Sequence, residues 1–317
     1  MKNAFRVLSL AAVFGLAATA WQGAVPSDLT WAFPAASKDA PKSSDDGKPK
    51  RIPGSTLSFS QEQIDGDPFN PPDWFPDQHQ TIPEVVAHGR RPAQACARCH
   101  LVNGNGHPES ATLTGLNAAY VFRQMQLFKS GTRKDYATVM NIFTKNLTDQ
   151  DFREAADYFA AQKPEVFGKV IEAARAPKTY VDDKFMRLPR PEGGTEPIGT
   201  RIITVPQDVH RTESRDPHSG FIAYVPPGSL KKGEALVRTG GNGKTVACAI
   251  CHGPELKGQS VAPRLAGQHP IFIARQLYKF QDGRNGGEWA ELMKGPVAKL
   301  TTHDIISIAA YVGSLEP

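Results

Sequence analysis

The sequence predicts an all-α fold made of two tandem copies of one helical unit, joined by a long irregular linker in which two strand-like runs could pair as a short β-hairpin. Three observations predict it: a five-residue motif that occurs twice, a longer repeat around that motif, and apolar side chains at helical spacing in each copy. The expected parts are a signal segment (1–20), a partly disordered extension (21–82), a first domain (83–164), a linker (165–228) and a second domain (229–317).

The repeat relates residues 96–164 to residues 248–317. When His252 is placed on His100, the residues that follow agree at many positions, and one inserted residue keeps the agreement to the end of the chain. Such self-similarity indicates two copies of one structural unit. The aligned pairs include Gly115 with Gly267, Arg123 with Arg275, Gln124 with Gln276, Gly131 with Gly283, and Met140 with Met293.

Each copy contains three predicted helices. The final helix starts at a capping-box-like pair, Thr148 with Asp151 in the first copy and Thr301 with Asp304 in the second. Apolar residues then follow at positions i, i+3, i+4 and i+7, which is the helical period. A glycine should end each middle helix. The expected opening helices are 83–88 and a segment that begins at 229, and the expected middle helices are 118–129 and 270–281.

The repeated motifs are Cys96-Ala97-Arg98-Cys99-His100 and Cys248-Ala249-Ile250-Cys251-His252, and they use all 4 cysteines. Cys-x-x-Cys-His is typical of c-type haem attachment, in which two thiols form thioether bonds and the histidine binds iron. A zinc site would need four ligands close together, and a thioredoxin-like pair needs no histidine after it. The sequence therefore predicts two covalently bound haem c groups, attached at Cys96, Cys99, Cys248 and Cys251 and ligated by His100 and His252.

Methionine is the expected sixth ligand of an iron that only carries electrons. Met140 and Met293 occupy equivalent places before the last helix of each copy, so we assign Met140 to the first iron and Met293 to the second. The alternative is that both simply fill gaps in a core. Met125 aligns with Leu277 and is expected in the core. Among the other histidines, His218 is the one to test for proximity to a haem edge.

These motifs resemble the class I c-type cytochromes, and their tandem arrangement resembles the two-domain dihaem type (cytochrome c4-like). The resemblance rests on the attachment motifs, the Pro263–Gly267 stretch, the Arg-Gln helices and the methionine before a Leu-Thr-x-x-Asp helix start. It covers about half of the chain and implies helical haem-pocket domains that transfer electrons. It also implies that the carbonyl group of Pro263 orients the axial histidine, whereas the first copy has Ala111. We therefore predict different midpoint potentials for the two haems.

The linker and the extension have no counterpart in that family. Residues 201–205 and 221–225 are strand-like, and we expect them to form either a small β-hairpin against a haem domain or a strap between the domains. Residues 35–51 are rich in Lys, Asp and Ser and are expected to be disordered. Trp74 and Phe75 are expected to pack along the first domain.

The N-terminus predicts export. A basic start precedes an apolar run over residues 7–18, which is shorter than the roughly 20 residues that span a bilayer. A small-x-small sequence at 18–20 then suggests cleavage of a secretory signal peptide, and haem c is attached outside the cytoplasmic membrane, so the periplasm is the expected location. The alternative is an uncleaved anchor that would associate the protein with the membrane. The formal net charge of +5 would be nearly cancelled by haem propionates, and nothing indicates nucleic acid.

The expected function is that of a periplasmic dihaem electron carrier that cycles between Fe(II) and Fe(III), without catalytic residues. Its expected partners are a dehydrogenase or quinol-oxidising complex as donor and an oxidase or reductase as acceptor. One alternative is a dihaem oxidoreductase of the thiosulfate dehydrogenase or peroxidase kind, with the first haem as its centre because Ala111 departs from the pattern there. Another is a haem subunit of a larger dehydrogenase.

Overall fold

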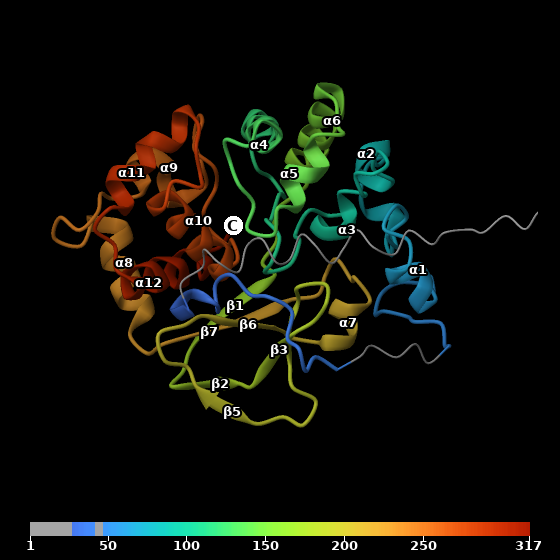
Figure 1. Cartoon of the computed structure of the whole chain (residues 1–317), viewed down its shortest axis with the longest axis horizontal. Helices are drawn as coiled ribbons and strands as arrows, with labels where there is room; N and C mark the ends of the chain where they lie inside the picture. The colour runs from blue at the N-terminus through green and yellow to red at the C-terminus, as the bar shows by residue number, and fades with distance from the viewer. Residues whose placement is uncertain (1–26, 42–46) are drawn as a thin grey trace, which may run out of the picture.

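The computed structural model describes residues 27–41 and 47–317, so the predicted signal segment lies outside the described residues. Two helical domains stand side by side above a layer of strands that is formed by the linker (Figure 1). Residues 27–41 of the extension run beneath the helices, and α1 (Gln61–Asp65) lies on the side of the first domain (Figure 1). Among the described residues, no helix is long and apolar enough to cross a membrane.

The helices of the first domain agree with the predicted ones. Thr148 accepts a hydrogen bond from the backbone N–H of Asp151 at 3.1 Å, and the Asp151 carboxylate accepts one from the Thr148 N–H at 2.9 Å. This reciprocal capping box starts the final helix. Gly131 ends the middle helix in the left-handed conformation, with φ of 77°. The helices are α2 (Glu84–Ala87), α3 (Ala97–His100), α4 (Ala118–Ser130), α5 (Val139–Thr144) and α6 (Asp149–Ala160).

The second domain repeats this order with a longer opening helix. Thr301 and Asp304 form the same capping box at the start of the final helix. The opening helix crosses the final helix at Gly233, where an added Cβ would lie 2.0 Å from the carbonyl oxygen of Ser307. The helices are α8 (Ser229–Thr239), α9 (Ala249–His252), η3 (Pro254–Leu256), α10 (Pro270–Gln281), η4 (Glu288–Ala290), α11 (Glu291–Val297) and α12 (Thr302–Gly313).

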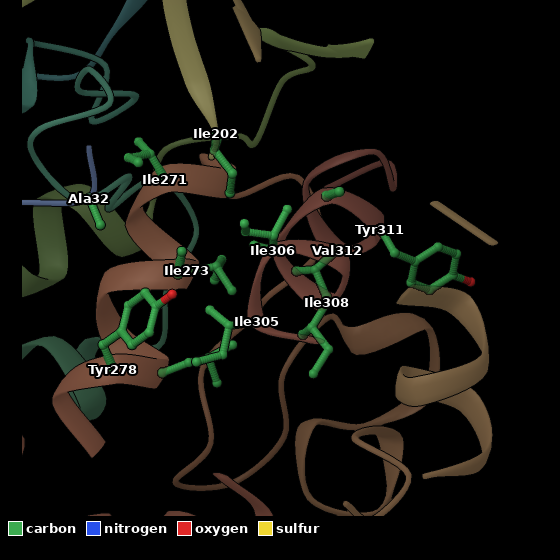
Figure 2. Packing of buried hydrophobic residues seen from close by; sticks show 14 of the residues in the cluster. Ala32, Ile202, Ile271, Ile273, Tyr278, Ile305, Ile306, Ile308, Tyr311 and Val312 are labelled. Atoms are coloured by element: carbon green, nitrogen blue, oxygen red, sulfur yellow. The ribbon is translucent and has the colours of Figure 1, made fainter. Parts of the chain in front are cut away.

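The core of the second domain takes side chains from four parts of the chain: the domain itself, the extension, the linker and Tyr136 of the first domain. Figure 2 shows Ile305 and Ile308 of α12 beside Ile273 of α10, with Ala32 of the extension and Ile202 of the linker at the border of the same cluster. Because these side chains are all buried, removing the extension or the linker would expose part of this core.

The all-α prediction is wrong for residues 165–228, whose described structure contains seven strands. The two strand-like runs do pair, with Ile203 opposite Tyr224, but α7 (Val209–Glu213) lies between them, so the connection is longer than a hairpin turn. The sheet has the order β1-β7-β6, with β1 parallel and β6 antiparallel to β7. The strands are β1 (Gly168–Glu172), β2 (Arg175–Pro177), β3 (Thr179–Val181), β4 (Arg187–Pro189), β5 (Thr195–Pro197), β6 (Ile203–Pro206) and β7 (Phe221–Val225).

The described parts of the extension are packed against the rest of the molecule. Ser37, inside the stretch that was expected to be disordered, exchanges two hydrogen bonds with Val181 of β3, at 2.8 and 2.9 Å. Trp74 is buried and donates its indole N–H to the carbonyl group of Ser214 at 2.7 Å. A polar composition predicts disorder only where no partner surface exists, and here the linker provides one. The short helices are η1 (Ser27–Leu29), α1 (Gln61–Asp65) and η2 (Pro76–Gln78).

Candidate haem sites

The two attachment motifs form matching one-turn helices, α3 and α9. The axial-ligand candidates His100 and His252 are both buried at the ends of these helices. The Nδ1 of His100 lies 2.9 Å from the carbonyl oxygen of Ala111, and the Nδ1 of His252 lies 2.9 Å from that of Pro263. Because a carbonyl can only accept, Nδ1 must carry the proton, and Nε2 is the nitrogen left to bind iron.

The hydrogen bond from the histidine to a backbone carbonyl is therefore present in both domains, although the first has Ala111 where the second has Pro263. The acceptor is a backbone carbonyl, which both residues have, and the two distances are equal. The reason first given for unequal midpoint potentials is wrong, and a difference must come from other surroundings of the two sites.

One cavity of about 740 Å³ connects the two sites. It is lined by His100, Met140, His252 and Met293 together with all four cysteines, so the structure brings every predicted ligand to a common space. Met140 lies on α5 and Met293 on α11, which are equivalent elements of the two copies. Pro263 lines the same space.

Two other methionines, Met125 and Met186, and the histidine His218 lie in surroundings that differ from those of the predicted iron ligands. Met125 is buried in the core of the first domain, as its alignment with Leu277 predicted, although it also borders the cavity. Met186 precedes β4 and is not among the cavity-lining residues. His218 is not among them either, since its Nε2 bonds to the side chain of Gln78 at 2.8 Å and its ring packs on Phe75.

Basic side chains concentrate where the two domains meet around the cavity. Arg123 donates to the carbonyl group of Val261 at 2.9 Å, and Arg264 donates to that of Thr114 at 2.9 Å, so each crosses to the other domain. Burial lowers the pKa of Arg264 to about 10 and that of Lys279 to about 7. Within the described chain, the buried Nε atoms of three of these arginines have no hydrogen-bond partner: Arg123, Arg133 and Arg264.

These observations show that the residues fit a haem group. Buried cations beside an apolar cavity need anionic partners, because an unpaired buried charge is costly. The propionate groups of haem c would be such partners, while the thiols, the imidazole Nε2 atoms and the thioether sulfurs would bind the rest of the group.

Some cavity residues were not predicted as site residues. The pairs Arg123-Gln124 and Arg275-Gln276 served only as markers of the repeat, yet all four line the cavity, and their duplication was the available signal. His107 and Glu109 also line it, with no signal in the sequence because neither has a like residue in the second copy. Burial lowers the pKa of His107 to about 3 and raises that of Glu109 to about 7.

The one-turn Cys-x-x-Cys-His helices, the histidine-to-carbonyl bonds and the methionines that line the same cavity are typical of the class of c-type haem proteins. The family model described as cytochrome c matches residues 230–316. The chain is 34% identical to cytochrome c-554(548) of Halomonas halodenitrificans over 24% of this chain and 93% of that protein. It is 28% identical to cytochrome c4 of Pseudomonas aeruginosa over 73% of this chain and 88% of that one. It is 24% identical to the thiosulfate dehydrogenase electron acceptor of Thiomonas intermedia over 70% of this chain and 79% of that one.

The chain belongs to the class I c-type cytochromes, in the tandem two-domain dihaem group of cytochrome c4. It is a cytochrome that carries two covalently attached haem c groups and transfers electrons between redox partners by cycling of iron between Fe(II) and Fe(III).

Proposed function

We propose that His100 and Met140 bind the first iron and that His252 and Met293 bind the second, with the four cysteines forming the thioether bonds. The carbonyl groups of Ala111 and Pro263 would hold the two imidazole rings in one tautomer and orientation. The observation that carries this proposal is that the two methionines come from equivalent elements and line the same cavity as the histidines.

This ligand set supports electron transfer rather than catalysis at iron. An enzyme that acts at a haem needs an open sixth position, whereas both copies offer a methionine sulfur there. We infer that the donor is a dehydrogenase or quinol-oxidising complex and that the acceptor is an oxidase or reductase. The name of the Thiomonas relative, an electron acceptor of thiosulfate dehydrogenase, supports a dehydrogenase as donor.

We also infer that the protein works in the periplasm. The attachment motifs support this location, because the thioether bonds of haem c are formed outside the cytoplasmic membrane. The basic and then apolar N-terminus, which lies outside the described residues, supports export as well.

The far-red absorption band of oxidised iron–methionine haem tests the ligands directly. Met140→Ala and Met293→Ala should each remove about half of this band, because each would break one of two iron–sulfur bonds. Met125→Leu is the matched control, since the second copy has Leu277 at that place, and it should leave the band unchanged. An unchanged band in Met140→Ala would show that another residue binds the first iron.

A further inference from the structure

The edge that carries the thioether bonds is covered very differently in the two domains. Ala97 of the first motif is buried, whereas its equivalent Ala249 is exposed. The side chain of Arg98 is 13% exposed, whereas Ile250, its equivalent in the second motif, is 69% exposed. Cys251 is exposed, and Cys99 is partly buried. Two motifs of almost the same sequence therefore present one closed and one open edge.

Residues 47–82 lie against the first attachment motif, and we call this segment the N-terminal cap. Arg98, which aligns with Ile250, donates to the carbonyl groups of Ile64 and Asp65 at the end of α1, at 2.9 and 2.8 Å. Arg215 of the linker donates to the carbonyl group of Ile64 at 3.1 Å and to that of Arg98. The cap is thus bonded to the attachment motif itself.

Asp65 joins these elements electrostatically. Its carboxylate pairs with Arg215 at 3.1 Å, with Arg98 at 3.6 Å and with Lys184 of the β3–β4 turn. Burial opposes ionisation of this carboxyl, but Arg215 and Lys184 outweigh it and hold the pKa of Asp65 below its usual value. The cap also has its own small core of Ile52, Ile64, Trp74 and Phe75.

The open edge of the second haem has an apolar rim, formed by Val246, Ile250, Trp289 and Leu292, all exposed. Val246, Trp289 and Leu292 also line the cavity. Charged neighbours pair locally, as Glu291 with Lys294 at 2.7 Å and Glu255 with Lys257 at 3.3 Å. These two pairs lower the net charge beside the rim, and its exposed apolar side chains suit a partner whose own contact face is apolar.

We propose that the protein exchanges electrons with its partners only at this rim, and that the N-terminal cap makes the first haem an internal site reached through the second. The partner is a redox protein whose electron-transfer edge is ringed by apolar side chains. The partner's reduced centre would give one electron to the second haem, which His252 would hold, and the second haem would pass that electron to the first, which His100 would hold. This inference rests on the proposed ligands of the two irons.

The experiment uses the oxidised holoprotein mixed rapidly with a reduced single-haem cytochrome c of lower potential as the probe. Ile250→Glu adds a charge to the rim and should slow the reduction of both haems about tenfold, because an unpaired charge at an apolar contact weakens docking. Ile142 is the matched control, since it is exposed two residues after Met140 in the first domain. Ile142→Glu should change neither rate. If Ile250→Glu slowed the reduction of one haem only and Ile142→Glu slowed the reduction of the other, electrons would enter at two sites. That result would overturn the proposal.

A second variant tests the cap itself. Asp65→Ala leaves Arg98, Arg215 and Lys184 without their shared anion, so the cap should open. In an Ile250→Glu background it should restore fast reduction of one haem, whereas Asp39→Ala, which removes a pair with Arg190 elsewhere in the extension, should not. If amide exchange shows the cap open and no fast phase returns, the cap does not close the first haem. The far-red band should be measured on every variant, because it reports the iron–methionine bonds. An unchanged band shows that a change in rate does not come from the loss of a proposed ligand.

Discussion

At the residue scale, the backbone decides more of the haem environment than the side chains do. Ala111 and Pro263 differ in sequence, but each places its backbone carbonyl oxygen 2.9 Å from the Nδ1 of a candidate axial histidine. Arg98 and Ile250 also differ, and here the difference matters, because one is held by the cap and the other is open to solvent. A residue difference between the two copies changes the surroundings of the site only where the side chain, and not the backbone, makes the contact.

Glu109 is the residue through which pH should act on the first haem. Its carboxyl lines the cavity, and burial raises its pKa to about 7, against the opposing charges of Arg275 and Arg187 and with Asp182 adding to the rise. Ionisation as pH rises adds a negative charge, which favours oxidised iron. The midpoint potential of one haem should therefore fall through about pH 7, by at most about 59 mV per pH unit.

Potentiometric titration at several pH values checks this expectation. Glu109→Gln should reduce the slope near pH 7, and the slope that remains is the contribution of Lys279, which lines the same cavity and whose pKa burial lowers to about 7. Glu213→Gln is the control, because burial also raises the pKa of Glu213 but its side chain is not among the cavity-lining residues. If the slope in Glu109→Gln were the same as in the unchanged protein, the dependence on pH would not come from Glu109.

At the element scale, the two domains differ most in their opening helices. In the second domain α8 spans Ser229–Thr239 and packs closely on α12, whereas in the first domain α2 spans only Glu84–Ala87. The close approach of α8 depends on Gly233, since any Cβ would overlap the Ser307 carbonyl group. Helix crossing at this distance requires a residue without a side chain.

Gly233→Ala should destabilise the second domain by about 1–3 kcal/mol, because the helices must move apart. The sign of the change in the free energy of unfolding distinguishes the two cases, since exchange of glycine for alanine in an unhindered helix stabilises by roughly 0.5–1 kcal/mol. Gly295→Ala in α11 is the control, with no atom within 4 Å of the added Cβ. Denaturant unfolding of the two holoprotein variants measures the difference. Equal effects would mean that α8 and α12 are not held this closely.

At the scale of the whole molecule, the features that occur in both copies were predicted from the sequence, whereas most of the structure of the linker and the extension was not. The duplicated motifs, the capping boxes at Thr148 and Thr301, and the middle helices were all visible as local patterns. Of the linker strands, β6 and β7 were predicted as strand-like runs, but β1 to β5 were not, because several of these are three residues long and pair with distant partners such as β2 with β5. The cap was also invisible, since the bonds from Arg98 and Arg215 to α1 join segments far apart in the chain.

The closed edge supplies a new reason for unequal midpoint potentials, and it gives the sign. Burial disfavours the extra positive charge of oxidised iron, and three cations surround a single carboxylate at Asp65. The first haem should therefore have the higher potential. A redox titration should show two components, with the higher one lost in Met140→Ala and the lower one lost in Met293→Ala. A single component, or the reverse assignment, would contradict this expectation.

The contacts that Arg123 and Arg264 make across the domains have a consequence for the rate of internal transfer. Domains joined by a flexible linker usually move relative to one another. Here the arginines bond each domain to the other, and the strands of the linker lie beneath both (Figure 1). These contacts would hold the two haems at a fixed spacing. We therefore expect that electron transfer between the haems needs no domain motion and that its rate does not depend on solvent viscosity.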